Sequence, residues 1–147
     1  MGALISNILT TDSDKKMILL RIIVGLIFLS EGIQKYLFPE TIGTGRFEKI
    51  GFDNPVFWAY FTATFEIVCG SLVLIGLFSR IATIPLLIVM GTAFVTTKWP
   101  ILVEKGFWPM AHEYRTDFAM TVLLIVILIY GSGRISLDSM IVKSIKP

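Results

Sequence analysis

The sequence contains only one cysteine, Cys69, and only one histidine, His112. A single cysteine cannot form an internal disulfide, a CxxC redox pair or a thiolate cluster. A single histidine excludes bis-histidine haem ligation within one protomer and argues against a conventional zinc site. We therefore expect no metal site and no intrinsic cofactor. Cys69 is interpreted as a small packing residue, and His112 as an interfacial hydrogen-bonding residue.

Charge is also scarce. Charged residues make up 16% of the 147-residue chain, and the formal net charge is only +2. No cluster of lysine and arginine is dense enough to predict nucleic-acid binding, so that class is excluded. No self-contained catalytic motif occurs either, which leaves open whether the chain is an enzyme in its own right. Residues 1–16 do not have the pattern of a cleaved signal peptide, and we expect a short polar or interfacial lead-in there.

Apolar residues, in contrast, are abundant: 54% of the chain is hydrophobic, and the mean hydropathy is +0.78. About twenty apolar residues suffice for one helix to cross a bilayer. The sequence therefore predicts one all-α domain over residues 1–147, an integral membrane bundle of four antiparallel transmembrane helices. The expected helices cover about 17–38, 56–78, 81–97 and 114–130, with connections at 39–55 and 98–113.

The two connections differ in character, although both are expected on the same side of the membrane. The first alternates apolar and charged residues, which predicts a short turn of helix lying on the bundle. The second is rich in aromatic residues, which are typical of the headgroup level. A slim excess of lysine and arginine elsewhere places both termini on the inner side.

The first apolar segment carries its polar residues on one face. At about 100° per residue, Arg21, Glu31 and Lys35 share that face with Gly25 and Gly32. A charge buried in the bilayer costs at least ~2.5–3.5 kcal/mol on insertion scales, so this face should turn toward protein or trapped water. The two glycines favour close packing against another helix.

Other segments bring carboxylates to the same bundle. Glu66 lies about ten residues, or roughly 15 Å, along the second helix. Glu113 and Asp117 lie near the start of the fourth helix. Because the helices alternate in direction, Lys35 and its neighbours should meet one of these two carboxylates near the mouth of the bundle. Glu66 should then lie deeper.

Six residues are therefore candidates for ligand binding or proton relay: Arg21, Glu31, Lys35, Glu66, Glu113 and Asp117. Arg21 is expected nearest the opposite membrane face. The same residues also permit a simpler interpretation, in which opposite charges only neutralise each other and fix the helix register. Both interpretations remain open, because buried ion pairs and functional sites use the same residue types.

Several short motifs follow one another in a characteristic order along the chain. They are Arg21-x3-Gly25-x2-Phe28-x3-Gly32-x2-Lys35, then Phe47-Glu48-Lys49-Ile50-Gly51, then Glu66-x3-Gly70 with Gly76-x3-Arg80, then Glu113, and finally Gly131-Ser132-Gly133-Arg134-Ile135-Ser136-Leu137-Asp138. In order and spacing, this set resembles the DoxX family of membrane proteins. The resemblance extends from about residue 17 to residue 138.

The resemblance implies a multi-pass protein of the bacterial inner membrane with four helices. Some members of that family look like the small membrane subunit of a thiosulfate:quinone oxidoreductase. Others are tied to oxidative-stress or thiol-homeostasis assemblies, where they anchor soluble partners such as superoxide dismutase and a sulfurtransferase. By this likeness, the polar residues of the family pattern are Arg21, Lys35, Glu66 and Glu113. Glu31 and Asp117 rest on helical geometry alone.

Three functions are compatible with these observations. The favoured one is a small membrane subunit or anchor that binds a quinone- or lipid-like ligand in its bundle and serves a soluble redox partner. Quinone binding needs only one or two hydrogen-bond donors and apolar walls. The second is a small proton- or ion-coupled transporter, which would act as a homodimer because four helices are few for alternating access. The third is a purely structural interaction protein.

Overall fold

The computed structural model describes residue 9 and residues 14–145, and it is helical with no strand in that part of the chain. Most of the expected lead-in at residues 1–16 lies outside the described residues. The described helices are α2 (Met17–Leu37), α3 (Thr44–Lys49), α4 (Pro55–Ile75), α5 (Ser79–Ala93), the π-helical turn η1 (Phe94–Lys98), α6 (Trp99–Lys105), α7 (Phe107–Tyr130) and α8 (Leu137–Ile145).

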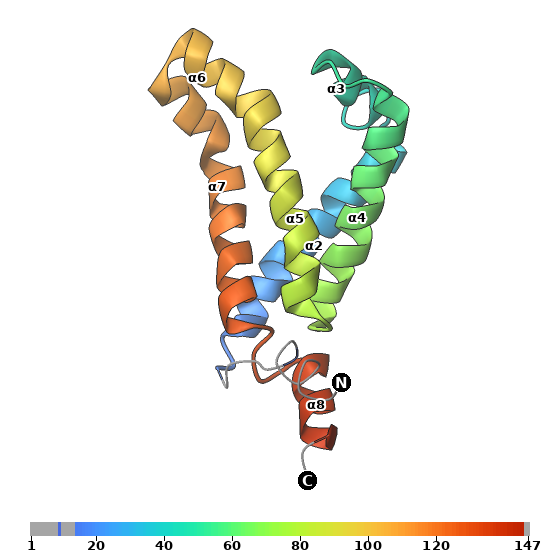
Figure 1. Ribbon diagram of the computed structural model, residues 1–147, viewed down its shortest axis with the longest axis vertical. Helices are drawn as coiled ribbons and strands as arrows, with labels where there is room; N and C mark the ends of the chain where they lie inside the picture. Colours follow the sequence, from blue (N-terminus) through green and yellow to red (C-terminus); the bar gives the residue numbers. More distant parts are fainter. Residues whose placement is uncertain (1–8, 10–13, 146–147) are drawn as a thin grey trace.

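The long helices form two pairs that diverge like the arms of a V (Figure 1). Helix α2 packs along α4 in one pair, and α5 packs along α7 in the other. The pairs meet at the end where α4 turns into α5, which we call the closed end. At the other end, the open end, α3 caps one arm and α6 caps the other (Figure 1).

Glycines hold α2 against α4. A Cβ atom added at Gly25 would lie 2.7 Å from the Cβ of Leu74 and 2.9 Å from the carbonyl oxygen of Gly70. A Cβ atom at Gly32 would lie 2.7 Å from the carbonyl oxygen of Ala63. Real side chains do not approach backbone so closely, so only glycine permits this helix separation. The expected role of both glycines in close packing is confirmed.

Three described stretches are long and apolar enough to cross a membrane: Met17–Leu37, Pro55–Ile75 and Ser79–Lys105. The first two agree with the expected spans within three residues at each end. The buried residues of α2 include Arg21, Gly25 and Lys35, so the polar face points into the protein as its periodicity predicts. Apolar residues on other sides of that helix, such as Leu19, Ile23 and Leu26, are exposed.

The expected connection at 98–113 differs from the structure, which is helical there. Helix α5 continues through η1 and α6 to Lys105, and α7 begins at Phe107, so that Gly106 alone separates them. Pro100 and Pro109 lie in the first turns of α6 and α7, where proline costs no hydrogen bond. Gly106 has φ of 86°, which glycine adopts without strain. The prolines and the glycine thus begin helices instead of forming a loop. The first connection, in contrast, does contain the expected short helix, α3.

Candidate functional site

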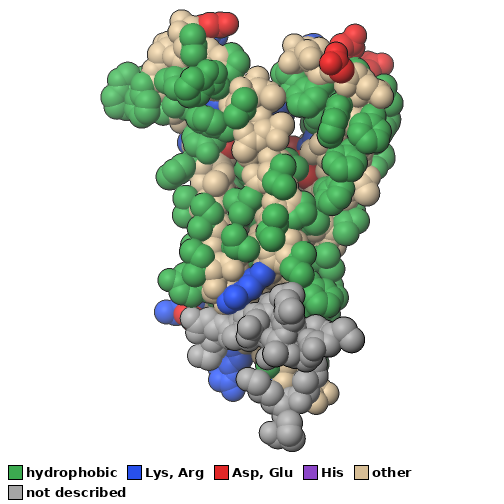
Figure 2. Space-filling model, viewed as in Figure 1, with side chains coloured by type: hydrophobic (Ala, Val, Ile, Leu, Met, Phe, Trp, Pro, Cys, Tyr) green, Lys and Arg blue, Asp and Glu red, His purple; other side chains and the backbone are tan. Residues whose placement is uncertain are grey.

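A cavity of about 600 Å³ lies between the two arms, toward the open end. Its lining comes from α2, α3, α4, α5, η1 and α7, so no single helix pair could form it. Figure 2 shows the molecule hollowed between its two lobes, with charged side chains visible inside the hollow. The volume is in the range of small-molecule sites, about 300–1,000 Å³.

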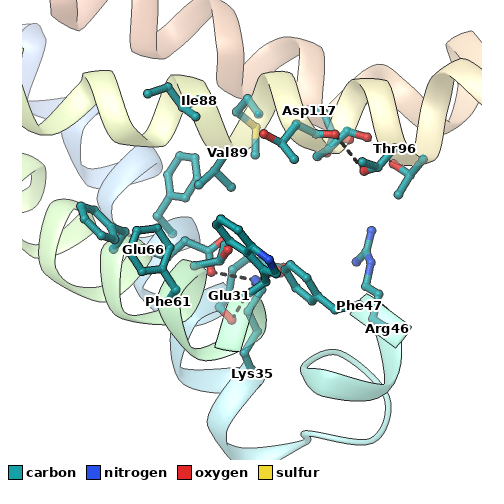
Figure 3. Close-up of a pocket in the computed structure, with 18 of the residues that line it drawn as sticks. Glu31, Lys35, Arg46, Phe47, Phe61, Glu66, Ile88, Val89, Thr96 and Asp117 are labelled. Atoms are coloured by element: carbon teal, nitrogen blue, oxygen red, sulfur yellow. Dashed lines mark hydrogen bonds and ion pairs between the residues drawn. The ribbon is translucent and has the colours of Figure 1, made fainter. Parts of the chain in front are cut away.

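The principal polar feature of the cavity is an ion pair between α2 and α4. Lys35 Nζ donates a hydrogen bond of 2.7 Å to Glu66 Oε2, and the two residues are only 7% and 3% exposed. Glu31 approaches the same ammonium group from one turn earlier, with its Oε2 at 3.7 Å. Lys35 therefore lies between two carboxylates, as Figure 3 shows. The predicted inward orientation of Lys35, Glu66 and Glu31 is what the structure has.

An aromatic wall rises from this ion pair to the mouth of the cavity. Phe65 and Phe61 lie 4.8 Å apart between ring centroids, Phe61 and Trp58 5.8 Å, and Trp58 and Phe52 6.2 Å. Phe47 of α3 continues the series at 5.3 Å from Phe52. All five rings line the cavity. Rings at these separations form a continuous apolar surface on which a flat ligand can stack.

A second ion pair lies on the opposite arm. Lys98 Nζ of η1 is 3.5 Å from Asp117 Oδ2 of α7, with side-chain exposures of 11% and 26%. Asp117 lines the cavity beside Thr116, Thr96 and Thr97. Asp117 therefore does belong to the site, but its partner is Lys98 and not Lys35. Sequence reasoning missed Lys98 because it was assigned to a connection.

Arg46 is a further cavity residue that the sequence did not single out. It extends from α3 toward the space between the arms (Figure 3). Among the residues that the structure describes, no ion pair or hydrogen bond to its guanidinium group occurs. A free cation at the mouth favours the approach of an anionic or carbonyl-bearing molecule. Its place in a short polar helix offered no sequence signal.

Arg21 belongs to a different part of the molecule. Its Nη1 donates hydrogen bonds of 2.6 Å and 2.8 Å to the carbonyl oxygens of Ser132 and Ile135, and its Nη2 donates one of 3.3 Å to that of Leu74. These contacts lie at the closed end, where residues 131–136 follow α7. Arg21 is fourteen residues before Lys35, or about 21 Å along the helix, so it anchors a turn and does not reach the cavity.

The last of the sequence motifs, residues 131–138, has a structural role as well. The carboxylate of Asp138 accepts hydrogen bonds from the backbone N–H groups of Phe78 and Ser79, at 2.7 Å and 3.3 Å. These are free donors at the start of α5, so Asp138 caps that helix from a distant part of the chain. Gly76, with φ of 75°, lies against the Arg21 guanidinium group. The motif therefore fastens the closed end.

The remaining candidates lie outside the cavity. Glu113 is exposed on α7 and does not line the cavity. His112 is exposed and lies 3.4 Å from Arg115, between Nδ1 and Nη1. Cys69 is buried in the apolar core with Val73 and Phe28, as expected of a packing residue. Within the described part of the chain, no group of histidine, cysteine and carboxylate side chains could hold a metal ion.

Comparison with known proteins identifies relatives of this chain among membrane proteins. Residues 17–99 match the family model named DoxX. The chain is 46% identical over 143 residues to the membrane protein Rv3486 of Mycobacterium tuberculosis, covering 93% of this chain and 88% of that protein. It is 31% identical over 130 residues to CatD of Bacillus subtilis, a protein provisionally named an oxidoreductase, covering 88% and 89% of the two chains. No solved structure matches.

Proposed function

This chain belongs to the DoxX family of membrane proteins, and we propose that it binds a quinone- or lipid-like molecule in the cavity between its two arms. In this proposal it is a small membrane subunit or anchor that serves a soluble redox partner. The observation that carries the proposal is the buried Lys35–Glu66 pair, which faces a largely apolar and aromatic cavity of about 600 Å³.

The chemistry of the pair supports a ligand with carbonyl or hydroxyl groups. The Lys35 ammonium group can donate to a carbonyl oxygen, and the carboxylate of Glu66 or Glu31 can accept from a hydroxyl. Apolar walls with a few placed polar groups are typical of sites for hydrophobic ligands. In this proposal, electrons pass between the soluble redox partner and the bound quinone.

The setting is the plasma membrane of a bacterium. Both relatives are bacterial, and one of them is named a membrane protein. Beyond the three apolar spans, we assign the fourth crossing to α7, which packs against α5 along the same arm. The name of CatD supports an oxidoreductase role, and the likeness to family members in oxidative-stress assemblies supports a soluble redox partner.

The test is to look for the ligand directly. Protein purified in mild detergent is extracted and analysed by mass spectrometry, and its thermal midpoint is measured with and without added quinone. We expect a co-purified quinone or lipid and a quinone-dependent rise in the midpoint, both lost in the K35M/E66L double variant. E113Q, which changes an exposed carboxylate outside the cavity, is the matched control. The proposal is refuted if the wild-type protein carries no co-purified quinone or lipid and shows no quinone-dependent thermal shift.

A second function is favoured by one specific observation. Lys35 is shared by two carboxylates, Glu66 at 2.7 Å and Glu31 at 3.7 Å, and one ammonium group between two carboxylates is an arrangement that proton relays use. A proton- or ion-coupled transporter, acting as a homodimer, would use it. In liposomes, flux that is unaffected by E66Q or K35M would exclude this function.

A further inference from the structure

The cavity has polar groups on two opposite walls. Lys35, Glu66 and Glu31 project from the arm made by α2 and α4, whereas Asp117 projects from α7 on the other arm (Figure 3). The partner of Asp117 is Lys98 of η1. Apolar side chains such as Phe61, Val89 and Met120 line the cavity as well. A ligand in this space would meet the Lys35–Glu66 pair on one side and, on the other, the Asp117 carboxylate, whose partner Lys98 lies 3.5 Å from it outside the cavity lining.

We infer that the Lys98–Asp117 pair is a second polar subsite, and that the ligand is a compact ring molecule with hydrogen-bonding groups at two opposite edges. The inference rests on the proposed function, since it assumes a ligand in the cavity, and it selects a quinone-like class over a single-headed lipid. A single polar head would satisfy one subsite and leave the other pair facing an apolar tail, which is unfavourable.

The Lys98–Asp117 pair has unused hydrogen-bonding capacity. Its nitrogen and oxygen are 3.5 Å apart, longer than a charge-assisted hydrogen bond of about 2.7–2.9 Å. Within the described residues, the Asp117 carboxylate accepts no hydrogen bond, and Thr121 donates to the backbone oxygen of Asp117. In contrast, the Lys35 nitrogen and the Glu66 oxygen are in direct hydrogen-bond contact at 2.7 Å. The longer pair can admit a ligand oxygen between or beside its two charges.

A π-helical turn in the helix that carries Lys98 directs this side chain toward Asp117. A π-helical turn takes up one extra residue, so residues after it are rotated by about 100° from their place in an uninterrupted α-helix. The π-turn Phe94–Lys98 ends at Lys98, whose side chain is largely buried toward α7. Thr96 and Thr97 of the same turn line the cavity. Such π-turns frequently occur at functional sites.

The Lys35–Glu66 pair presents a donor and an acceptor to the cavity, and the second subsite presents the Asp117 carboxylate with the Lys98 ammonium group 3.5 Å from it. An ammonium group donates to a carbonyl oxygen, and a carboxylate accepts from a hydroxyl. A ring with two carbonyls and its reduced form with two hydroxyls can therefore both be held at both edges. This property suits a ligand that exchanges between the two forms while it remains bound.

The experiment compares two probes that differ by one oxygen. Dimethylnaphthoquinone carries carbonyls at two opposite ring positions, and dimethylnaphthol carries a single hydroxyl. Trp58 lines the cavity, so W99F/W108F protein leaves it as the only tryptophan and reports binding by fluorescence quenching. The naphthol is measured by its competition with the quinone. We expect the quinone to bind about tenfold more tightly, since one hydrogen bond is worth about that factor.

The variants then locate the second hydrogen bond. K98M/D117L should reduce quinone affinity about tenfold, to the level of the naphthol, and change naphthol affinity less than threefold. D117N, which keeps the side-chain shape, should reduce quinone affinity at least threefold and decides the matter if the double variant does not fold. E113Q, one turn earlier on α7, should leave both affinities unchanged.

Two further outcomes separate the inference from the proposal beneath it. If K98M/D117L and D117N bind the quinone as the wild type does while K35M/E66L does not, the second subsite is refuted and the cavity site stands. Equal wild-type affinity for the two probes would refute the second subsite as well. If neither probe binds to wild-type protein, the quinone-binding proposal and the second subsite both fail.

Discussion

The ammonium group of Lys35 lies 2.7 Å from the carboxylate of Glu66, and the two residues come from different helices separated by thirty-one positions in the chain. Both are almost fully buried in a protein whose outer surface is apolar along its spans. The pair is made possible by Gly32, where α2 touches the backbone of Ala63 on α4. Helix contact and charge pairing therefore depend on each other.

Breaking the pair from one side should cost more than removing it entirely. K35M leaves Glu66 buried without a partner and should lower the free energy of unfolding by about 3–5 kcal/mol. E66Q should cost less, because Glu31 remains 3.7 Å from the Lys35 ammonium group. K35M/E66L should cost less than K35M alone. Thermal or denaturant unfolding in detergent measures all three, and a K35M/E66L protein as unstable as K35M or less stable would contradict the coupling.

The same double variant separates a structural pair from a ligand site. If the pair only holds the fold, K35M/E66L should retain full activity in cells and the same co-purified molecules as the wild type. If the cavity is a ligand site, folded K35M/E66L should lose the ligand. The measurement is mass spectrometry of the purified variant beside its unfolding curve.

Gly25 should tolerate no side chain. In G25A the new Cβ would lie 2.7 Å from Leu74 Cβ and 2.9 Å from the Gly70 carbonyl oxygen, so α2 and α4 must separate. We expect a loss of about 1–3 kcal/mol in stability, the usual cost of overpacking. G91A is the matched control, because nothing lies within 4 Å of a Cβ at Gly91 on α5. A G25A protein as stable as G91A would contradict the packing.

Arg21 should stabilise the closed end without affecting the cavity. R21M removes three hydrogen bonds to backbone carbonyl oxygens, two of which lie in the turn after α7. We expect a loss of at least about 2 kcal/mol and faster amide hydrogen exchange in residues 131–138. Quinone affinity of the folded fraction should stay unchanged. R134M, at an exposed arginine in the same turn, should alter neither quantity, and slow exchange in R21M would count against the anchor.

The π-turn should make one deletion tolerable. Deleting Val95, which is 64% exposed, converts the widened turn to an ordinary α-turn and keeps Lys98 opposite Asp117, because the turn holds one residue more than an α-helix needs. Deleting Ile88 in the α-helical part of the same helix should rotate everything after it by about 100° and abolish folding. Thermal unfolding of the two deletion variants checks this, and equal damage from both would argue against the π-turn.

Part of the site was predictable because its signals are local. The helical period alone places Arg21, Glu31 and Lys35 on the inner face of α2, and the structure confirms this. The depth of Glu66 follows from its distance from the start of α4. The contact between Lys35 and Glu66 required the separation and rotation of two helices. The sequence instead paired Lys35 with Glu113 or Asp117, neither of which it meets.

The connection at 98–113 shows why local signals can mislead. Proline and glycine usually interrupt helices, but a proline in the first turn of a helix is compatible with it. Pro100 and Pro109 therefore start α6 and α7, and the π-turn before them sets the direction of Lys98. A proline that interrupts a helix and a proline that begins one look alike in sequence, so the Lys98–Asp117 pair was not predictable.

Hydrophobic content and periodicity by themselves determined that this protein is a membrane-spanning helical bundle with a polar face on its first span. These properties depend on residues close together in the chain, which share one helix whatever surrounds it. The tertiary structure decided which charges meet, that the arms diverge to leave a cavity, and that Arg21 fastens the opposite end. Those outcomes depend on contacts between helices, where the absence of a single Cβ at Gly25 or Gly32 sets how closely two backbones approach.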